Sequence, residues 1–207
     1  KNPWPNGWRQ KTSIMGVINL TPDSFSDGGD LNSAEKVLDQ VNQFLHNGVD
    51  IIDLGAQSTR PGADEVGPNV EIKRLIPYLK LIKSKYPDVL ISIDTFNSEV
   101  AYEALMNGAH WINDVTGGRR DKEILDVVSK FNCPFVITHS RGNSKNMNEL
   151  SKYENLLSEV KGSLEILINN AFEKNISKRN IILDPGIGFS KDINQNLEIL
   201  RNLDVFK

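Results

Sequence analysis

Residues 89–114 read VLISIDTFNSEVAYEALMNGAHWIND, and this stretch decides the fold. It begins with a short apolar run over 89–94, which has the length of a buried strand. Apolar residues then recur at helical spacing over 97–107, and a second short apolar run covers 110–114. A strand, a helix and another strand in this order predict two parallel strands joined by a helical crossover.

The same alternation extends in both directions along the chain. Further strands are predicted at 13–19, 50–55, 134–138 and 181–184, and further helices at 32–47, 70–85, 121–131, 152–174 and 193–202. Strands with continuous apolar faces, separated by amphipathic helices, indicate a parallel sheet in an α/β protein. Two architectures remain open at this point: a doubly wound sheet, or a (β/α)8 TIM barrel with only about six of its eight βα units in this chain.

The spacing of the units favours the barrel. Polar residues at predicted strand ends recur about every 33 residues, so eight units would need about 264 residues, close to the ~250 that are typical of this barrel. Residues 1–12 contain two Pro and two Trp without a period and are predicted to be a loop or linker. The expected domain is therefore an incomplete barrel over residues 13–207.

The composition is that of a globular protein. The chain has 207 residues, of which 39% are hydrophobic and 25% charged, and its net charge is −3. This charge gives no bulk attraction to nucleic acid or to an anionic membrane, and no apolar run has the length of a membrane span. The single cysteine, Cys133, excludes an internal disulfide, and no Cys or His spacing is typical of a zinc site.

Polar residues end or directly follow five of the predicted strands, and the strand at 50–55 carries Asp53 within it. In a parallel barrel these ends face one crevice, where catalytic groups gather. Asp and Asn side chains together suit a heterocycle with an amide and amino edge, such as a purine, pterin or pyrimidine. The alternatives are helix caps, turn formers or a generic polar cleft. The residues concerned are Asn19, Asp53, Asp94, Asn113, Asp114, His139 and Asp184.

Three loops add candidate contacts. The loop over 20–30, LTPDSFSDGGD, carries Phe25, which suits either a lid over a flat substrate or a plain loop. The loop over 57–62, QSTRPG, offers Thr59 and Arg60 as a grip for phosphate oxygens, or simply a surface arginine. In 184–189, DPGIGF, the glycines allow a ligand to approach the backbone, with Phe189 as an apolar wall.

The motifs at these positions resemble the dihydropteroate synthase family. The resemblance covers residues 13–207 and runs in family order through VINLTPDSFSDGG at 17–29, STRPG at 58–62, SIDT at 92–95, INDV at 112–115, HSRG at 139–142 and DPGIGF at 184–189. It implies a (β/α)8 barrel that joins 4-aminobenzoate to 6-hydroxymethyl-7,8-dihydropterin diphosphate in folate biosynthesis. It also implies Mg²⁺ as cofactor and an enzyme of the class that sulfonamides target.

The resemblance also implies a role for each matching residue. Asn19 would hold Mg²⁺ and pyrophosphate, and Thr59 with Arg60 would contact the diphosphate. Asp94, Asn113 and Asp184 would hydrogen-bond the pterin edge, beside Phe189. Phe25 and Pro61 would enclose 4-aminobenzoate. Asp94, Asn19 and Arg60 would be the catalytic set, and no protein nucleophile is required.

Some features depart from the family pattern. Gln57 stands where many bacterial members have Glu, and Thr138 and Ser140 flank His139 where Met is frequent. The family motifs Ser-Arg-Lys and Arg-x-His, which follow strands seven and eight, do not occur before Lys207. Because those groups help to bind pterin and diphosphate, the 207-residue piece alone is expected to be inactive or nearly so.

Two other function classes are open from the sequence. One is a pterin-binding, corrinoid-dependent methyltransferase domain, and the other is a non-catalytic barrel module of a larger protein. The resemblance further implies a homodimer at full length and, in eukaryotic members, fusion to an upstream pterin pyrophosphokinase domain. The expected location is cytoplasmic, or mitochondrial in a eukaryote.

Overall fold

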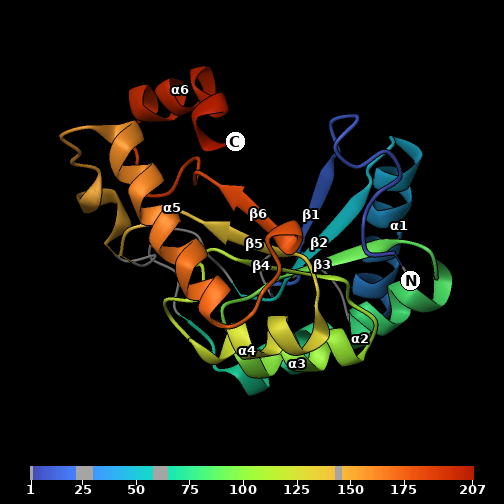
Figure 1. Ribbon diagram of the computed structural model, residues 1–207. Helices are drawn as coiled ribbons and strands as arrows, with labels where there is room; N and C mark the ends of the chain where they lie inside the picture. The colour runs from blue at the N-terminus through green and yellow to red at the C-terminus, as the bar shows by residue number, and fades with distance from the viewer. Residues whose placement is uncertain (1, 22–29, 58–64, 143–145) are drawn as a thin grey trace.

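The computed structural model describes residues 2–21, 30–57, 65–142 and 146–207. Strands and helices alternate along these residues, as predicted (Figure 1). The strands are β1 (Met15–Asn19), β2 (Ile51–Gly55), β3 (Leu90–Asp94), β4 (Trp111–Asp114), β5 (Phe135–Thr138) and β6 (Ile181–Asp184). The helices are α1 (Asp30–His46), α2 (Pro68–Lys85), α3 (Ser98–Met106), α4 (Glu123–Phe131), α5 (Leu156–Glu173) and α6 (Ile193–Arg201).

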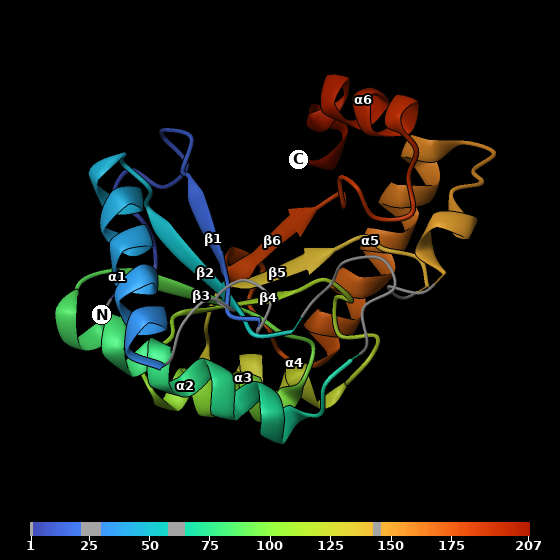
Figure 2. The same ribbon diagram turned by 180° about the vertical axis from the view of Figure 1, so that it is seen from behind.

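The strand order separates the two predicted architectures. All six strands are parallel and lie in the sheet in the order β1-β2-β3-β4-β5-β6. A doubly wound sheet reverses its strand order at a switch point, whereas a barrel adds each strand beside the previous one. Figures 1 and 2 show α1 to α5 around the outer side of the curved sheet. The fold is therefore of the barrel type.

Helix α5 begins later than the predicted residue 152. Asn155 occupies its N-cap, and the Asn155 side chain accepts a hydrogen bond from the Ser158 backbone N–H at 3.1 Å. A short 3-10 helix at Met147–Leu150 precedes it. The prediction placed the start of this helix three to four residues too early, within the usual uncertainty of helix ends.

The two faces of the sheet carry different side chains. Outward-facing residues pack beneath the helices in the main hydrophobic core, and they include Ile18, Ile52, Leu54, Ile91, Ile93, Ile112, Phe135 and Ile137. Since side chains alternate along a strand, the residues between them face the barrel interior. These interior positions are Met15, Val17 and Asn19; Ile51, Asp53 and Gly55; Leu90, Ser92 and Asp94; Trp111 and Asn113; Val136 and Thr138; and Ile182 and Asp184.

The interior face of the sheet changes from apolar to polar along the strands. At the strand starts the interior is apolar, where Ile51, Leu90, Trp111 and Val136 form a second hydrophobic cluster. At the strand ends it is polar. The amino end of the barrel is thus a packed floor, and the carboxyl end is available for ligands.

The N-terminal segment contributes to this floor. The rings of Trp4 and Trp8 lie 5.1 and 5.5 Å from that of Trp111, both in edge-to-face geometry. The Trp111 indole N–H also donates to the Pro3 carbonyl oxygen at 2.6 Å. Residues before β1 therefore anchor to β4, far along the chain, and cover the amino end of the barrel.

Replacing Trp4 with alanine is expected to lower the free energy of unfolding by about 2 kcal/mol, because the half-buried ring loses its packing on Trp8 and Trp111. Urea unfolding followed by circular dichroism measures this change. Trp4→Phe is the matched control, since it keeps an aromatic ring and should retain most of the stability. Equal stability of Trp4→Ala and the wild type would show that the segment is not anchored.

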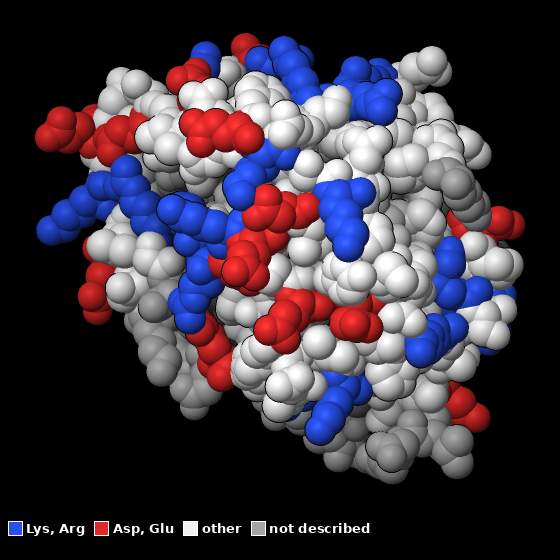
Figure 3. Space-filling model, turned by 60° about the horizontal axis from the view of Figure 1, so that its bottom comes forward, with Lys and Arg blue, Asp and Glu red and all other residues white. Residues whose placement is uncertain are grey.

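The outer surface carries both signs of charge. Figure 3 shows the face on which α2, α3 and α4 lie, with acidic side chains in its middle and basic side chains around them. This mixture agrees with the net charge of −3 and gives no single-sign surface on this face. Among the helices of the described residues, none is long and apolar enough to cross a membrane.

Candidate active site

Three of the predicted site residues lie in one row across the sheet. The strand register pairs Asn19 with Gly55, Gly55 with Asp94, and Asp94 with Asn113. All four positions face the interior at the carboxyl ends of β1 to β4. Gly55 leaves space in this row, since a Cβ atom there would stand 3.3 Å from Asp94 Oδ2. Asn19, Asp94 and Asn113 are thus brought together as the sequence predicted.

Asp184 completes the polar rim on the other side. It ends β6 and is paired in register with Thr138 of β5. Its carboxylate is held at both oxygens: the Gly186 backbone N–H donates to Oδ1 at 2.8 Å, and the Thr138 hydroxyl donates to Oδ2 at 3.3 Å. Phe189, in the loop that follows, is half-buried. Phe25, Thr59, Arg60 and Pro61 lie outside the described residues, so their roles stay predictions.

Asp53 has a role that the sequence did not specify. It lies beneath the rim, is 2% exposed, and accepts a hydrogen bond from the Asn113 amide nitrogen, with 3.1 Å between Nδ2 and Oδ2. Because this contact uses the amide nitrogen, the carbonyl oxygen of Asn113 is the atom turned to other partners. Asp53 therefore orients Asn113. Its position in an inward row was the only available signal.

Asp94 lies in a crowded electrostatic environment. Burial raises the pKa of its carboxyl well above the usual value, and the neighbouring carboxylates Asp53, Glu71 and Asp114 raise this pKa further. Ionised Asp94 is therefore unfavourable without a partner. A ligand that presents N–H groups or developing positive charge to this carboxylate would lower the electrostatic cost of the buried negative charge, so the site favours such a ligand.

Two strand-end candidates turn away from this rim. Asp114 is fully buried and accepts from the Thr116 and Gly118 backbone N–H groups, each at 2.7 Å, so it shapes the loop after β4. His139 follows β5, and its Nδ1 lies 2.9 Å from the Lys191 ammonium. Burial lowers the pKa of His139 to about 3, and the nearby positive charges of Lys191, Arg141 and Arg119 lower it as well. His139 is thus neutral and part of the loop architecture.

Gly186 brings the loop after β6 against the end of β5. Its backbone has a φ of 73°, and a Cβ atom there would stand 1.9 Å from the His139 carbonyl oxygen. Both the left-handed conformation and the close approach require glycine. The sequence predicts that these glycines let a ligand approach the backbone; at Gly186 the group in close approach is instead the protein's own backbone.

Gly186→Ala is expected to destabilise the fold by about 3 kcal/mol or more, because it adds a backbone clash to the left-handed strain. Gly188→Ala is the matched control: Gly188 has a φ of 83°, but a Cβ atom there meets nothing within 4 Å. It should cost only about 1 kcal/mol. Urea unfolding of both variants measures the difference, and equal losses would contradict the clash.

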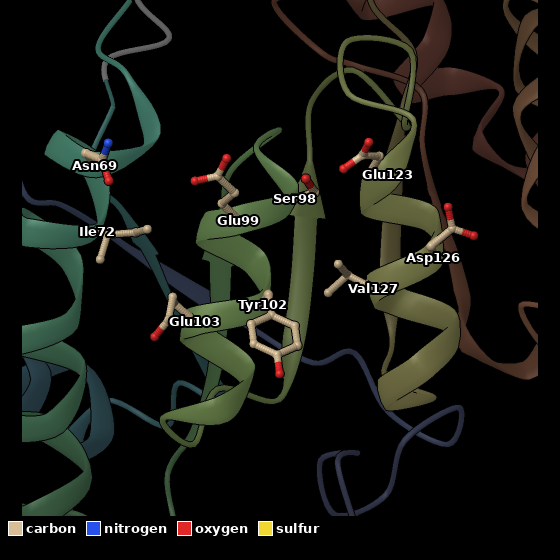
Figure 4. A pocket seen from close by; sticks show the side chains of 9 residues that line it. All are labelled: Asn69, Ile72, Ser98, Glu99, Tyr102, Glu103, Glu123, Asp126 and Val127. Carbon is tan, nitrogen blue, oxygen red and sulfur yellow. The ribbon is translucent and has the colours of Figure 1, made fainter.

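The hollow shown in Figure 4 is on the outside of the fold. It has a volume of about 720 Å³, and Glu99 and Glu103 of α3 and Glu123 and Asp126 of α4 are among its lining residues. Its walls belong to α2, α3 and α4 rather than to strand ends. It is therefore separate from the polar rim.

Asn19 at the rim is the predicted Mg²⁺ ligand. Within the described ranges, no group of three or more His, Cys, Asp or Glu side chains is arranged to hold one. Asn19 is exposed at the end of β1 and offers a carbonyl oxygen, a ligand type that Mg²⁺ accepts. Mg²⁺ commonly takes one or two protein oxygens and completes its shell with water and substrate phosphates. Asn19 fits that mode of binding.

Comparison with known proteins adds independent evidence. The model of the pterin binding enzyme family matches residues 15–207. A dihydropteroate synthase of Clostridium beijerinckii is 42% identical over 96% of this chain and 71% of its own length. A folic acid synthesis protein of Pneumocystis carinii is 46% identical over 97% of this chain, which spans only 27% of that protein. The crystal structure of dihydropteroate synthase from Clostridium difficile, obtained in the presence of pteroic acid, superposes with a TM-score of 0.88 at 40% identity and covers 96% of this chain and 73% of that one.

Proposed function

This chain belongs to the dihydropteroate synthase family of pterin-binding enzymes, and from that premise we propose the reaction of the protein that contains it. The protein joins 4-aminobenzoate to 6-hydroxymethyl-7,8-dihydropterin diphosphate and yields 7,8-dihydropteroate and pyrophosphate. The observation that carries this proposal is the inward row of Asn19, Asp94 and Asn113, with Asp184 across the rim. The pteroic acid of the Clostridium difficile structure is itself a pterin joined to 4-aminobenzoate.

The polar rim suits the pterin edge. Carboxylates of Asp94 and Asp184 accept hydrogen bonds from ring N–H and amino groups, and the carbonyl oxygen of Asn113 adds an acceptor. Asp184 is preorganised for this task, since Gly186 and Thr138 already fix both of its oxygens. Phe189 provides an apolar surface at the side of the flat ring.

The reaction is a displacement at the exocyclic methylene carbon of the pterin. The amine nitrogen of 4-aminobenzoate forms the new bond to this carbon as the bond to the diphosphate oxygen breaks, and the amine then loses a proton. Positive charge develops on the pterin methylene in the transition state, and the Asp94 carboxylate stabilises it. The protein supplies position and charge rather than a nucleophile.

The diphosphate end needs cations. We assign Thr59 and Arg60 to contacts with the diphosphate, and Phe25 and Pro61 to the enclosure of 4-aminobenzoate. Asn19 would hold Mg²⁺ at the rim together with the substrate's own oxygens. When bound, Mg²⁺ neutralises charge on the departing pyrophosphate.

The wider setting follows from the same proposal. A homodimer, fusion to a pterin pyrophosphokinase domain, a cytoplasmic or mitochondrial location and inhibition by sulfonamides are proposed properties of the whole protein. Fusion is supported by the Pneumocystis carinii relative, which is far longer than this chain.

An activity assay on the full-length protein tests the proposed reaction. The protein is incubated with both substrates and Mg²⁺, and dihydropteroate and pyrophosphate are quantified. Equimolar formation of the two products is expected. Pterin binding that is indifferent to the diphosphate, without product, would overturn the synthase reaction and favour the corrinoid-dependent methyltransferase class.

A further inference from the structure

A buried lysine follows the loop that carries Asp184 and Phe189. Lys191 is 9% exposed, and its ammonium contacts three acceptors: the Gly186 carbonyl oxygen at 3.0 Å, the Phe189 carbonyl oxygen at 2.9 Å and His139 Nδ1 at 2.9 Å. The ammonium has three N–H donors, so these acceptors match them in number. The contact to His139 requires an unprotonated Nδ1, which is the state of a neutral ring with its proton on Nε2.

Lys191 connects the two ends of this loop to the end of β5. Gly186 and Phe189 lie at either end of the turn, whose own hydrogen bond runs from the Phe189 N–H to the Gly186 carbonyl oxygen at 3.0 Å. His139 belongs to β5's carboxyl end, where its N–H donates to the Asp184 carbonyl oxygen at 2.8 Å. One side chain therefore holds the turn closed and also holds it against β5.

The neighbouring residue attaches the same loop independently. Ser190 is fully buried and donates from its hydroxyl to the Arg141 carbonyl oxygen at 2.6 Å. The Tyr153 hydroxyl donates to the Ser190 carbonyl oxygen at 3.0 Å. Because these contacts hold the residue that follows Phe189, removal of the Lys191 charge should loosen the turn without detaching the whole segment.

The buried charge is tolerated at a cost. Burial lowers the pKa of Lys191 to about 8, the positive charge of Arg141 also lowers it, and the nearby Asp184 carboxylate raises it. His139 contacts the ammonium directly; the Tyr153 ring lies 6.3 Å from that of His139, and the charge of Arg119 also acts on His139. A methionine of similar length would avoid this desolvation. The lysine therefore does not serve to stabilise the core; its role follows from the three groups that its N–H donors hold together.

We propose that Lys191 is a positioning residue for the pterin site, which acts by fixing the loop from Asp184 to Phe189 so that the carboxylate and the aromatic wall face the ligand together. This inference rests on the proposed function. Lys191 acts through this loop and is not assigned a contact with the substrate. Its effect is specific to the pterin, because the residues assigned to the other substrate lie on other loops.

The test uses Lys191→Met in the full-length protein, with Lys178→Met as matched control at an exposed lysine before β6. Lys191→Met should raise the KM for the pterin diphosphate about tenfold, as expected for loss of charged hydrogen bonds that preorganise a site. The KM for 4-aminobenzoate at saturating pterin should stay within about twofold. Lys178→Met should match the wild type in both.

A second pair of variants guards against misfolding. His139→Asn places an amide oxygen near the former Nδ1 and should keep near-normal pterin affinity, whereas His139→Leu removes the acceptor and should weaken it severalfold. Hydrogen exchange of the peptide over 184–190, measured by mass spectrometry, should speed up in Lys191→Met and in His139→Leu only. This readout does not depend on activity.

The pH dependence separates a charge effect from simple loss of packing. As the pH rises through the lowered pKa of Lys191, the neutral amine keeps two donors and turns a lone pair toward the third acceptor. The factor by which Lys191→Met raises the pterin KM should therefore be smaller at about pH 9.5 than at about pH 7. Because the wild type and Lys191→Met are measured with the same ligand at each pH, the titration of the ligand cancels in the ratio of their KM values.

Three outcomes separate failure of the proposed function from failure of the positioning role of Lys191. Failure of the wild type to bind the pterin diphosphate in a calorimetric titration would defeat the proposed function itself. Normal wild-type binding with an unchanged pterin KM in Lys191→Met would overturn the positioning role alone. Equal losses for both substrates, independent of pH, would assign Lys191 to general stability and overturn it as well.

Discussion

Asp94→Asn is expected to reduce kcat/KM by about 10²–10³, because the amide removes the negative charge that faces the developing cation and changes one acceptor of the pterin edge. The side chain keeps its size, so the loss should be electrostatic rather than steric. Steady-state kinetics on the full-length protein measure it. Asp39→Asn, at an exposed position of α1, is the matched control and should leave kcat/KM unchanged.

The same substitution should raise thermal stability. The pKa of Asp94 is raised in the folded chain, so the folded state binds its proton more tightly than the unfolded state does. Stability therefore falls as the pH rises from the pKa of Asp94 in the unfolded chain through its pKa in the folded chain, and at neutral pH the ionised carboxyl is a net cost. Asparagine removes this cost, and a gain of about 1 kcal/mol is expected.

A loss of kcat/KM together with a gain in stability would identify Asp94 as a functional carboxylate. A structural aspartate would lose stability when replaced, and its activity would fall in parallel. Scanning calorimetry of wild type, Asp94→Asn and Asp39→Asn at pH values on both sides of neutrality gives the comparison. A lower melting temperature for Asp94→Asn with near-normal activity would place Asp94 outside the catalytic machinery.

The second large effect concerns the extent of the chain. The isolated 207-residue chain should turn over at least about 100-fold more slowly than a version extended by two βα units, because two further strand ends would contribute to the rim. In the described sheet, β1 and β6 are the edge strands and are not paired with each other. Closure of a barrel requires strands between them.

This comparison is made with the two chains at equal concentration in the same assay. Circular dichroism checks that both are folded. Turnover of the two chains within a factor of about two would contradict the prediction, since it would mean that groups after strands seven and eight are dispensable.

The fold could be predicted because each strand is largely apolar on both of its faces. In β3, Ile91 and Ile93 face the helices while Leu90 and Ser92 face the interior, so the run is almost wholly apolar. The polar residue then comes where the strand ends. Repetition of this pattern six times specified the parallel order, and with it the inward row that joins Asn19 to Asp94.

Other parts of the site depend on contacts that no local pattern encodes. Asp53 looks like any strand aspartate until the register brings Asn113 to it, 60 residues along the chain. Lys191 looks like a solvated lysine until the turn at Gly186 folds back on His139. The packing of Trp4 on Trp111 likewise joins distant segments. In each case tertiary approach, rather than residue type or spacing, creates the interaction.

A calorimetric titration of the full-length protein with 6-hydroxymethyl-7,8-dihydropterin diphosphate, with and without Mg²⁺, tests directly whether the inward strand ends bind this substrate. We expect saturable binding of one ligand per site, stronger with Mg²⁺ and greatly weakened by Asp94→Asn. Absence of binding, or an affinity that neither Mg²⁺ nor Asp94→Asn alters, would contradict the assignment of the inward strand ends as a pterin diphosphate site.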